Sequence, residues 1–520
     1  MRQCFSPSTT SLARTLAPIH NQPVINCLKN RPWVAVTSLA FALLSALPGC
    51  TTNPATGDQS FTAFMSAEDE ARIGAEEHPK ILKDLGGRYQ ARDLSAYVRY
   101  IGRKLSTLSE MPKVPWRFTV LNDHRVNAFA LPGGYVYVTR GLLALADNEA
   151  EMAGVLAHEI GHVTARHSAQ RYSTAMATNI GLTGLGILGS VFGVPTGLGQ
   201  IASTGAQMAL QQHSQSQELE ADMLGVRYMT RAGYSPNAMT TFFRKLKAHA
   251  DLEARQKGKD GANHNIMSTH PRTEDRISQA MKLAKIKAVA HPIIGRDVYL
   301  ARIDGMVFGD DPTQGVIKGR QFMHPELKVT FTVPSRFVII NSPKQVVAFG
   351  PEKSRIVFDM VNPKEAPKIR NLAAYLKGVW GRSMNVSGVE HLQINGMPAV
   401  TGQARVSGSG STREVRLVMV RASDEHIFRL AFITKPSEAR RLNVELRRTT
   451  YSLRRLSATE ADAIRPLRLK VHQVRTSENV ATLAARFPFE RFQREWFRLL
   501  NSIQVGEKVH PGRQVKIVVE

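Results

Sequence analysis

The chain has 520 residues, 43% of them hydrophobic, which excludes a single small domain and favours several globular domains with sizeable cores. Lysine and arginine exceed aspartate and glutamate by 68 to 43, which gives a formal net charge of +25. The three cysteines are Cys4, Cys27 and Cys50, so zinc sites built from cysteine are excluded from the remainder of the chain.

The first fifty residues are typical of a bacterial export signal. A basic segment ends near Arg31, residues 33–47 are apolar and uncharged, and Leu-Pro-Gly-Cys follows. This ending resembles a lipobox, in which Cys50 becomes the lipidated first residue. We therefore predict a signal peptide with lipobox at residues 1–50. A plain transmembrane anchor is the alternative, although the apolar run is shorter than the ~20 residues that a spanning helix needs.

The predicted location is the periplasm, with the chain anchored to the outer membrane as a lipoprotein. Thr51 stands where an aspartate would retain a lipoprotein in the inner membrane. An inner-membrane anchor with a periplasm-facing chain is the alternative. In that compartment a basic surface would meet anionic lipid head groups or cell-wall polymer, and nucleic acid is not an expected partner. An ordinary solvated surface would account for the same charges.

Residues 157–162 read Ala-His-Glu-Ile-Gly-His and contain the pattern H-E-x-x-H. Their surroundings predict a helix, because Asn148 and Glu151 have the spacing of a capping box. The apolar residues that repeat with helical period are Met152, Val155, Leu156 and Ile160. The pattern therefore lies on a capped, amphipathic helix, where a chance match is rare.

On such a helix His158 and His162 lie four residues apart and face the same side, so both imidazoles can bind one cation. Glu159 projects beside them, where a metal-bound water needs a base. We predict a zinc hydrolase with one Zn²⁺ per chain.

A catalytic zinc usually has three protein ligands, so a third ligand is required. The metzincin pattern needs glycine at position 165 and histidine at position 168, but the chain has Ala165 and Ser168. His167 is predicted to lie on the wrong face of the helix. The metzincin arrangement is therefore excluded.

Residues 217–225, Gln-Glu-Leu-Glu-Ala-Asp-Met-Leu-Gly, provide a better source for the third ligand. Glu218 and Asp222 are four residues apart and share a helical face. Glu218 can therefore bind the metal while Asp222 orients a ligand histidine from behind. Glu220 points elsewhere and is expected to be a solvated surface carboxylate.

The pattern H-E-x-x-H followed at long range by E-x-x-A-D resembles the HtpX/BepA/Oma-type zinc metallopeptidases, which include the CAAX prenyl proteases. The resemblance covers about residues 60–290. It also includes Asn-Ala-Phe-Ala-Leu-Pro-Gly-Gly at residues 127–134, Ser66-Ala67-Glu68-Asp69-Glu70, and Ser268-Thr269-His270-Pro271 with Arg276. The family implies a mainly helical, gluzincin-type protease domain, which we place at residues 51–295, in the BepA/LoiP-like branch of periplasmic lipoproteins.

The resemblance also implies roles for individual residues. It implies zinc at His158, His162 and Glu218, with Glu159 as general base and acid. In BepA-like members the histidine that matches His270 approaches the metal and holds the enzyme inactive, which implies a similar switch here. A simple cap for the following helix is the alternative for His270.

Two further segments are expected to lie beside the site. The strand containing Asn127, Ala128 and Phe129 could pair with an extended substrate through backbone hydrogen bonds, or could be only structural. Between Arg171 and Glu218 the chain has no Lys, Arg, Asp or Glu and is rich in glycine. We expect a helical hairpin there that covers the active site or dips into the membrane surface, with buried core helices as the alternative.

Residues 296–460 have the pattern of a compact α+β domain with an antiparallel sheet. Strand character, broken by Pro334 and Pro343, is predicted at residues 328–340 and 345–360. Further strands are predicted at residues 393–404, 414–420 and 427–434, and helices at residues 368–379 and 437–453. This domain contains no recognisable catalytic constellation, and its pattern assigns it no role.

Residues 465–520 resemble a LysM module. A strand, two helices and a strand are expected between residues 467 and 519, with Leu-Asn and Pro-Gly landmarks. The usual Gly-Asp-Thr after the first strand is replaced by Ser-Glu-Asn at residues 477–479. LysM modules bind N-acetylglucosamine polymers, so the resemblance implies a peptidoglycan tether through residues 467–519. A purely structural cap is the alternative.

These features together predict an α+β multidomain protein that acts as a zinc metalloendopeptidase of the bacterial cell envelope. Its expected substrates are misfolded or stalled envelope and outer-membrane proteins. The alternative is a chaperone-like or peptidoglycan-tethered binding factor in which proteolysis is latent. Peptidoglycan hydrolysis is disfavoured because the motifs match peptidases, and the absence of tetratricopeptide repeats means that recruitment of partners through them is not assumed.

Overall fold

The computed structural model describes residues 50–184, 213–257, 270, 274–286, 289–408 and 411–520. Residues 49–520 cluster into one compact unit. The predicted signal peptide, most of the uncharged stretch and the motif residues Ser268, Thr269 and Pro271 lie outside the described part of the chain. Among the described helices, none is both long and apolar enough to cross a membrane.

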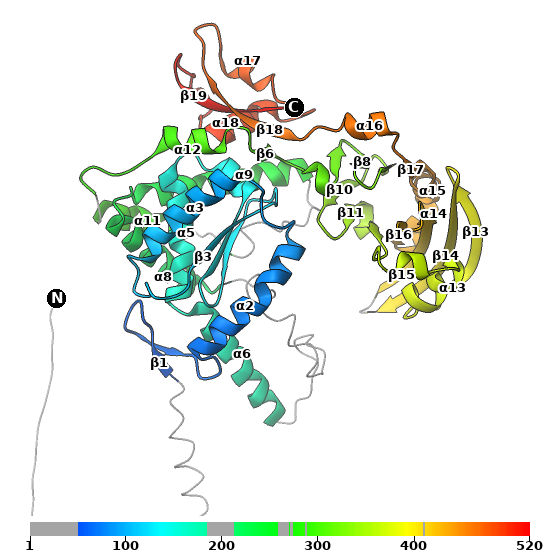
Figure 1. Cartoon of the computed structure of the whole chain (residues 1–520), viewed down its shortest axis with the longest axis horizontal. Helices are drawn as coiled ribbons and strands as arrows, with labels where there is room; N and C mark the ends of the chain where they lie inside the picture. The colour runs from blue at the N-terminus through cyan, green and yellow to red at the C-terminus, as the bar shows by residue number, and fades with distance from the viewer. Residues whose placement is uncertain (1–49, 185–212, 258–269, 271–273, 287–288, 409–410) are drawn as a thin grey trace, which may run out of the picture. The chain divides into compact units, whose positions relative to one another are not determined.

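Two long helices, α5 (Glu149–Thr164) and α8 (Gln215–Arg231), form the centre of the first domain (Figure 1). Fourteen of the sixteen residues of α5 are buried, so it is a core helix that is buried on nearly all sides, whereas its periodicity predicts an amphipathic helix. The surrounding elements are α2 (Ala67–Asp84), α3 (Arg92–Ser106), α4 (Arg140–Leu145), α6 (His167–Gly184), α9 (Asn237–Lys257), α11 (Glu274–Ile286) and α12 (Arg296–Ile303), with a hairpin of β1 (Cys50–Thr52) and β2 (Gln59–Phe61).

A three-stranded sheet precedes α5 in the chain and consists of β3 (Arg117–Leu121), β4 (Ala128–Leu131) and β5 (Tyr135–Thr139). Its order is β3-β5-β4, with β3 parallel and β4 antiparallel to β5. Gly133 and Gly134 join β4 to β5 with positive φ angles of 77° and 87°, a region that favours glycine. The short turn leaves β4 at the edge of this sheet.

The second domain contains two antiparallel sheets. The first has the order β17 (Arg454–Arg455), β9 (Val329–Thr332), β8 (Gln321–His324) and β7 (Val316–Lys318). The second has the order β10 (Val338–Asn341), β11 (Val346–Phe349), β12 (Arg355–Met360), β16 (Ile427–Thr434), β15 (Ser411–Arg421), β14 (Met397–Gly408) and β13 (Ser387–Ile394) (Figure 1). The antiparallel sheet predicted for this region is therefore present.

Each face of the seven-stranded sheet has its own apolar core. One core includes Val418 and Leu430 and is covered by α14 (Pro436–Arg441) and α15 (Asn443–Ser452). The other includes Leu417 and is covered by α13 (Leu372–Tyr375) and a π-helical segment (Leu376–Trp380). Side chains of β15 alternate between the two cores, as a strand covered on both faces requires. Short 3₁₀ segments at Pro312–Gln314, Pro351–Lys353 and Ala366–Lys368 complete the domain.

Some predicted elements of this domain differ from the observed ones. The strand predicted at residues 427–434 matches β16. The strand pattern predicted at residues 328–340, with its break at Pro334, corresponds to two strands, β9 and β10, because Pro334 between them has no N–H to donate to a ladder. The single helix predicted at residues 437–453 is divided into α14 and α15 at Leu442.

The last segment has the order strand, helix, helix, strand: β18 (Leu467–Gln473), α17 (Val480–Ala484), α18 (Gln493–Asn501) and β19 (Gln514–Val519), after a short helix α16 (Ala458–Asp462). The strands β18 and β19 are antiparallel, and β6 (Val307–Phe308) adds a third strand beside β18. Apolar side chains of this tail, including Leu469 and Phe497, belong to the same core as α5 and α12. The tail is therefore packed on the first domain.

A buried lysine of β19 stabilises the contact between the tail and the first domain. Lys516 Nζ donates to the carbonyl oxygens of Ala144, Leu145 and Ala146 at 2.9, 3.1 and 2.7 Å, which are carbonyls at the end of α4. It also lies 3.0 Å from Asp147 Oδ1, a carboxylate that pairs with Lys245 as well. Because Asp147 directly precedes the N-cap of α5, Lys516 of the tail contacts the start of the central helix.

Candidate metal centre

The start of α5 has the N-cap that its spacing predicts, but not the full capping box, because Glu151 Oε2 accepts from the N–H of Asp147 instead of that of Asn148. The side chain of Asn148 accepts a hydrogen bond from the backbone N–H of Glu151 at 2.9 Å. Two turns further on, His158 and His162 point the same way, and their Nε2 atoms are 3.1 Å apart. Both imidazoles are buried, with 6% and 4% of their surface exposed. The helix thus presents two nitrogen donors to one point in the interior.

Helix α8 brings a carboxylate to the same point. Ser214 and Gln217 form a capping box at its N-terminus. Gly225 lies against α5, where an added Cβ would be 3.3 Å from the backbone nitrogen of His158. This close approach places Glu218 Oε1 3.3 Å from His162 Nε2 and Glu218 Oε2 3.7 Å from His158 Nε2.

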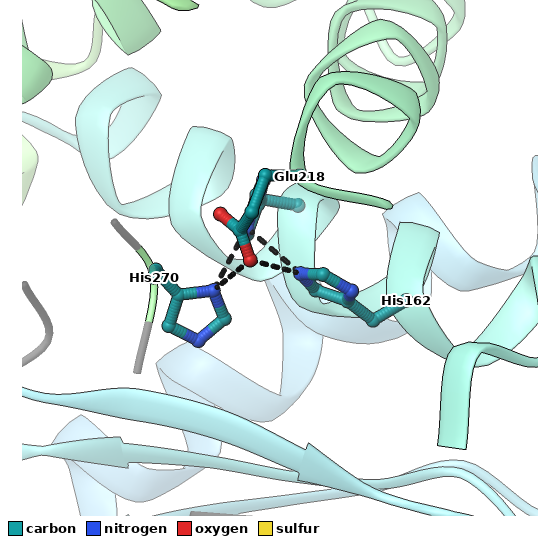
Figure 2. A group of neighbouring side chains, drawn as sticks. His162, Glu218 and His270 are labelled. Carbon is teal, nitrogen blue, oxygen red and sulfur yellow. Dashed lines mark hydrogen bonds and ion pairs between the residues drawn. The ribbon is translucent and has the colours of Figure 1, made fainter. Parts of the chain in front are cut away.

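His270 completes a group of four buried donors. Figure 2 shows Glu218 between His270 and His162, with dashed lines joining Glu218 to both rings. His270 Nδ1 lies 2.8 Å from Glu218 Oε1 and 3.3 Å from His158 Nε2. One donor atom from each of His158, His162, Glu218 and His270 lies within 4.8 Å of the others.

The chemistry of this donor set fits zinc. Ligands about 2.0–2.1 Å from a tetrahedral zinc are about 3.3–3.5 Å from one another, close to the separations observed here. The Nδ1 atoms of His158 and His162 face Asp222 and His167, so protons there leave the lone pairs of both Nε2 atoms facing each other. Two such lone pairs and a carboxylate repel unless a cation lies between them.

Asp222 lies behind His158 and does not face the four donors. Its Oδ1 is 2.9 Å from His158 Nδ1. Arg276 donates from Nε and Nη2 to both oxygens of Asp222 at 2.7 and 2.8 Å, and it also pairs with Glu218. Burial alone would raise the pKa of Asp222, but Arg276 and His158 hold it below its ordinary value. Asp222 is therefore an anion that orients His158.

His162 is supported by two residues whose roles the sequence analysis missed. Helix α5 ends at Thr164, and Arg166 adopts a left-handed conformation with φ of 56°, so His167 turns back towards the site. His167 Nδ1 lies 2.8 Å from His162 Nδ1, and its Nε2 lies 3.2 Å from Glu220 Oε2.

Glu220 is therefore not the solvated surface carboxylate that was expected. It also accepts from Asn53 Nδ2 at 2.7 Å, and only 25% of its side chain is exposed. If α5 continued as one helix, His167 would lie on the face that points away from the site. The helix instead ends at Thr164, and the left-handed turn at Arg166 changes the direction of His167. No local signal in the sequence marks this turn.

Comparisons with known proteins agree with this geometry. Residues 93–284 match the family described as Peptidase family M48. The beta-barrel assembly-enhancing proteases of Escherichia coli K12 and Yersinia pestis are 33% and 34% identical over 215 and 227 residues, which are 40% and 42% of this chain and 42% and 45% of theirs. The mitochondrial metalloendopeptidase OMA1 of Schizosaccharomyces pombe is 28% identical over 219 residues, 41% of this chain and 60% of its own.

We name the matched residues 93–284 the M48 domain. The chain spans less than half the length of the beta-barrel assembly-enhancing proteases that it matches. Among solved structures, LpqN of Mycobacterium tuberculosis covers 28% of the chain at 15% identity with a TM-score of 0.19, which is too low to compare folds. The match to the M48 family and to the named proteases confirms the resemblance on which the site motifs were interpreted.

Glu159 of the M48 domain is almost completely enclosed. Its side chain is 1% exposed, and its Oε1 lies 3.6 Å from His270 Nε2. Burial raises the pKa of the Glu159 carboxyl above its ordinary value, although His270 and His158 oppose the shift. A small cavity of about 10 Å³ adjoins Glu159, His162 and Ala130 of β4. In this structure the M48 site is closed.

His213, just before α8, is a further histidine that the sequence analysis missed. Its ring stacks on that of His162, with centroids 3.8 Å apart, and it forms a second possible donor group with His162 and His167. The residues that precede it, 185–212, lie outside the described part of the chain. Its position beside a ligand candidate could not be predicted without the three-dimensional arrangement.

The predicted substrate strand of the M48 domain lies at a sheet edge. The backbone N–H of Asn127 donates to the side-chain Oγ1 of Thr139 at 3.1 Å, and the backbone C=O of Asn127 accepts from the N–H of Thr139 at 3.0 Å. The side chains of Ala128 and Phe129 are buried, so they contribute to the core. Of this strand, only the backbone edge remains suited to pairing with a peptide. Cys50, the predicted lipidation site, is exposed in β1.

Proposed function

We propose that this protein is a zinc-dependent endopeptidase of the bacterial cell envelope that hydrolyses misfolded or stalled envelope proteins. The observation that carries the proposal is the convergence of His158, His162 and Glu218 at the spacing of zinc ligands, with Glu159 beside them. The similar proteins, a beta-barrel assembly-enhancing protease and a mitochondrial metalloendopeptidase, support the same activity.

When bound, zinc supplies a Lewis acid that activates a water and polarises the carbonyl of the scissile bond. Glu159 accepts the proton of that water and returns it to the leaving amine. Its raised pKa suits both roles, because a base and an acid near neutral pH need a carboxyl that holds its proton more firmly than usual. Asp222 and Arg276 keep His158 in the tautomer that can bind metal.

The backbone edge of β4 is the proposed binding site for the substrate. Among the described strands β4 pairs only with β5, so the N–H and C=O groups of its other edge can add an extended segment as a further strand, a mode that is tolerant of side-chain sequence. Such tolerance suits an enzyme whose substrates are unfolded chains of many sequences. The small cavity of the site is lined by Ala130 of this strand and by Glu159, so the strand lies beside the reacting groups.

His270 is proposed to hold the enzyme in a latent state. It contacts the ligand candidates Glu218 and His158 and lies beside Glu159, so it occupies space that a substrate carbonyl needs. Residues 271–273 and 258–269 lie outside the described part of the chain. Replacing His270 with Ala should increase proteolysis; unchanged zinc affinity and unchanged proteolysis would contradict the latch.

The first test is zinc content and casein cleavage for the wild type beside Glu159→Gln. The substitution removes the base but keeps the shape of the side chain and all candidate ligands. We expect bound zinc in both proteins and cleavage in the wild type only, with a loss of at least a thousandfold in rate. Cleavage by Glu159→Gln at the wild-type rate would contradict the proposed mechanism. Cleavage by neither would call for the same assay with His270→Ala.

Envelope location is proposed from the lipobox at Cys50 and from the relatives' names. Labelling with radioactive palmitate, followed by separation of inner and outer membranes, tests it directly. A Cys50→Ala chain should lose the label and become soluble in the periplasm. Recovery of the unlabelled wild type with the inner membrane would instead favour a membrane-anchored chain.

A binding factor with latent proteolysis is the second candidate, favoured by the closed M48 site. It predicts that Glu159→Gln fully restores a deletion strain, whereas the protease proposal predicts no restoration. Peptidoglycan tethering through residues 467–519 is a separate proposal, supported by the observed strand–helix–helix–strand order. Sedimentation of the whole chain with purified peptidoglycan tests it, and failure to pellet would reject it.

A further inference from the structure

The second domain contains a cavity of about 520 Å³, remote in sequence from every candidate zinc ligand. It lies between β14, β15 and β16 of the seven-stranded sheet and the helices α14 and α15. Cavities of roughly 300–1,000 Å³ are typical of small-molecule sites. The residues of its lining that decide its chemistry are Arg405, Glu414, Arg416, Phe432, Arg440 and Leu446.

The cavity continues the face of the sheet that elsewhere forms an apolar core. On β15 that face carries Val418 in the core, and Arg416 and Glu414 lie on the same face nearer to the start of the strand. In register, Arg416 lies opposite Phe432 of β16. Charged residues thus occupy positions that helix α15 covers, where the alternation of the strand would place apolar side chains.

Arg416 is a partly buried cation without a counter-ion. Its guanidinium lies 4.6 Å from the ring centroid of Phe432, and its Nη2 donates to Thr450 Oγ1 at 2.9 Å. Within the described part of the chain, it has no carboxylate partner. Burial, followed by the nearby charge of Arg447, lowers its pKa. Leaving such a charge unpaired costs free energy that an anion in the cavity would offset.

The one glutamate of the lining is already used by another arginine. Glu414 Oε1 accepts from Arg405 Nη2 and Nε at 2.5 and 2.9 Å. Arg440 of α14 adds a further positive charge. The lining therefore holds three arginines and one glutamate, a net charge of about +2. Asn443, the first residue of α15, also lines the cavity, and that helix N-terminus has no side-chain cap.

We propose that this cavity binds a small molecule through a phosphate or carboxylate group. The planar fork of the Arg416 guanidinium, fixed by Phe432 and Thr450, is suited to such an oxyanion. The apolar side of the cavity, formed by Phe432 and Leu446, can hold an apolar body attached to the anion. The anion could thus be free, or could be the head group of a single-chain amphiphile.

Calorimetric titration of residues 49–520, the part of the chain that forms one compact unit, tests this proposal. The probes are inorganic phosphate, decanoate and decyl phosphate. The variants are Arg416→Gln and, as matched control, Arg448→Gln, which removes an exposed arginine of α15 outside the cavity lining. We expect binding to wild type and control, and about tenfold or greater weakening in Arg416→Gln.

Each outcome of the titration either supports or overturns the proposed anion site. Binding of decyl phosphate much more tightly than inorganic phosphate supports an amphiphile as the ligand, and equal binding supports a free anion. Absence of binding of all three probes at millimolar concentration overturns the proposal. Equal affinities for wild type and Arg416→Gln overturn it as well, because the anion would then lie elsewhere.

Thermal unfolding provides an independent readout. Replacing Arg416 with Met removes the unpaired charge, so we expect a Tm at least as high as that of the wild type without ligand. The binding probe should raise the Tm of the wild type and leave that of Arg416→Met unchanged. If Arg416 served only the fold, the Met variant would unfold at a lower temperature and no probe would raise the wild-type Tm, which would overturn the proposal.

Discussion

The two histidines of the M48 site are supported in different ways. Asp222 contacts His158 directly, and Arg276 neutralises that carboxylate. His162 is supported indirectly, because His167 lies between it and the carboxylate of Glu220. Each of these two histidines is nevertheless linked to one carboxylate, directly for His158 and through His167 for His162, the arrangement that fixes the tautomer of metal-binding imidazoles.

Removing the charge of Glu220 should therefore weaken zinc binding. Asn53 and His167 contact different oxygens of Glu220, and in Glu220→Gln one of these oxygens becomes an NH2 group that cannot accept. The uncharged side chain therefore holds His167 less firmly, and His162 loses the orientation of its proton acceptor. We expect zinc affinity to fall by about tenfold. Competition with a chromogenic chelator measures this, with Glu68→Gln, an exposed glutamate of α2, as control. An affinity equal to that of the control would show that the chain of contacts behind His162 is unimportant.

Residue positions could be predicted where one helix carries them all. His158 and His162, and likewise Glu218 and Asp222, follow from a spacing of four on a continuous helix. His167 could not be placed, because the left-handed turn at Arg166 has no distinctive sequence.

At the scale of elements, the site depends on how closely α5 and α8 approach each other. Gly225 of α8 lies against the backbone of His158, and a Cβ there would also meet Met239 at 3.3 Å. A larger side chain must push the two helices apart, and Glu218 moves with α8. The distance between the helices thus sets the distance between the donors.

Gly225→Val should reduce both stability and metal binding. Overpacking of this kind costs about 1–3 kcal/mol in the free energy of unfolding, and displaced donors should lower zinc affinity further. Urea unfolding and zinc titration measure the two effects. The matched control is Gly378→Val in the second domain, because an added Cβ there meets nothing within 4 Å. Normal zinc affinity in Gly225→Val would mean that α8 can repack without moving Glu218.

Among the elements, alternation along strands was the most informative pattern. It located β16 to the residue, since both faces of that strand are covered and both ends are marked by turns. The periodicity of the apolar residues did not predict that α5 is buried on nearly all sides. Small residues such as Ala153 and Gly154 allow the helix to be buried on the sides that its larger apolar residues do not cover. The break at Leu442 between α14 and α15 had no signal in the helical pattern.

At the scale of the molecule, the tail shares a core with the M48 domain although about 180 residues separate them along the chain. Its sequence predicted a separate module, because pattern alone shows which residues are apolar but not which surface they cover. The contact of β19 with Asp147 and α4 passes directly to the start of α5. The tail is thus placed to stabilise the helix that carries both histidines.

Lys516→Met should loosen this contact. Methionine has a similar length but leaves the carbonyls of Ala144, Leu145 and Ala146 without their donor, at a cost of about 1–3 kcal/mol in the free energy of unfolding. Urea unfolding measures the difference, with Lys508→Met, an exposed lysine of the tail, as control. Equal stability of the two variants would show that the apolar core alone holds the tail.

The stabilising effect of Lys516 should also depend on pH. One carboxylate, Asp147, serves two buried lysines, and burial together with the charge of Lys245 lowers the pKa of Lys516 to about 7 from an ordinary value of 10.5. Between these values the unfolded chain binds the proton more tightly than the folded one, so the folded state gains stability as pH rises. The difference in unfolding free energy between wild type and Lys516→Met should therefore grow from pH 7 to pH 10. A difference that shrinks over this range would mean that the folded protein holds Lys516 charged.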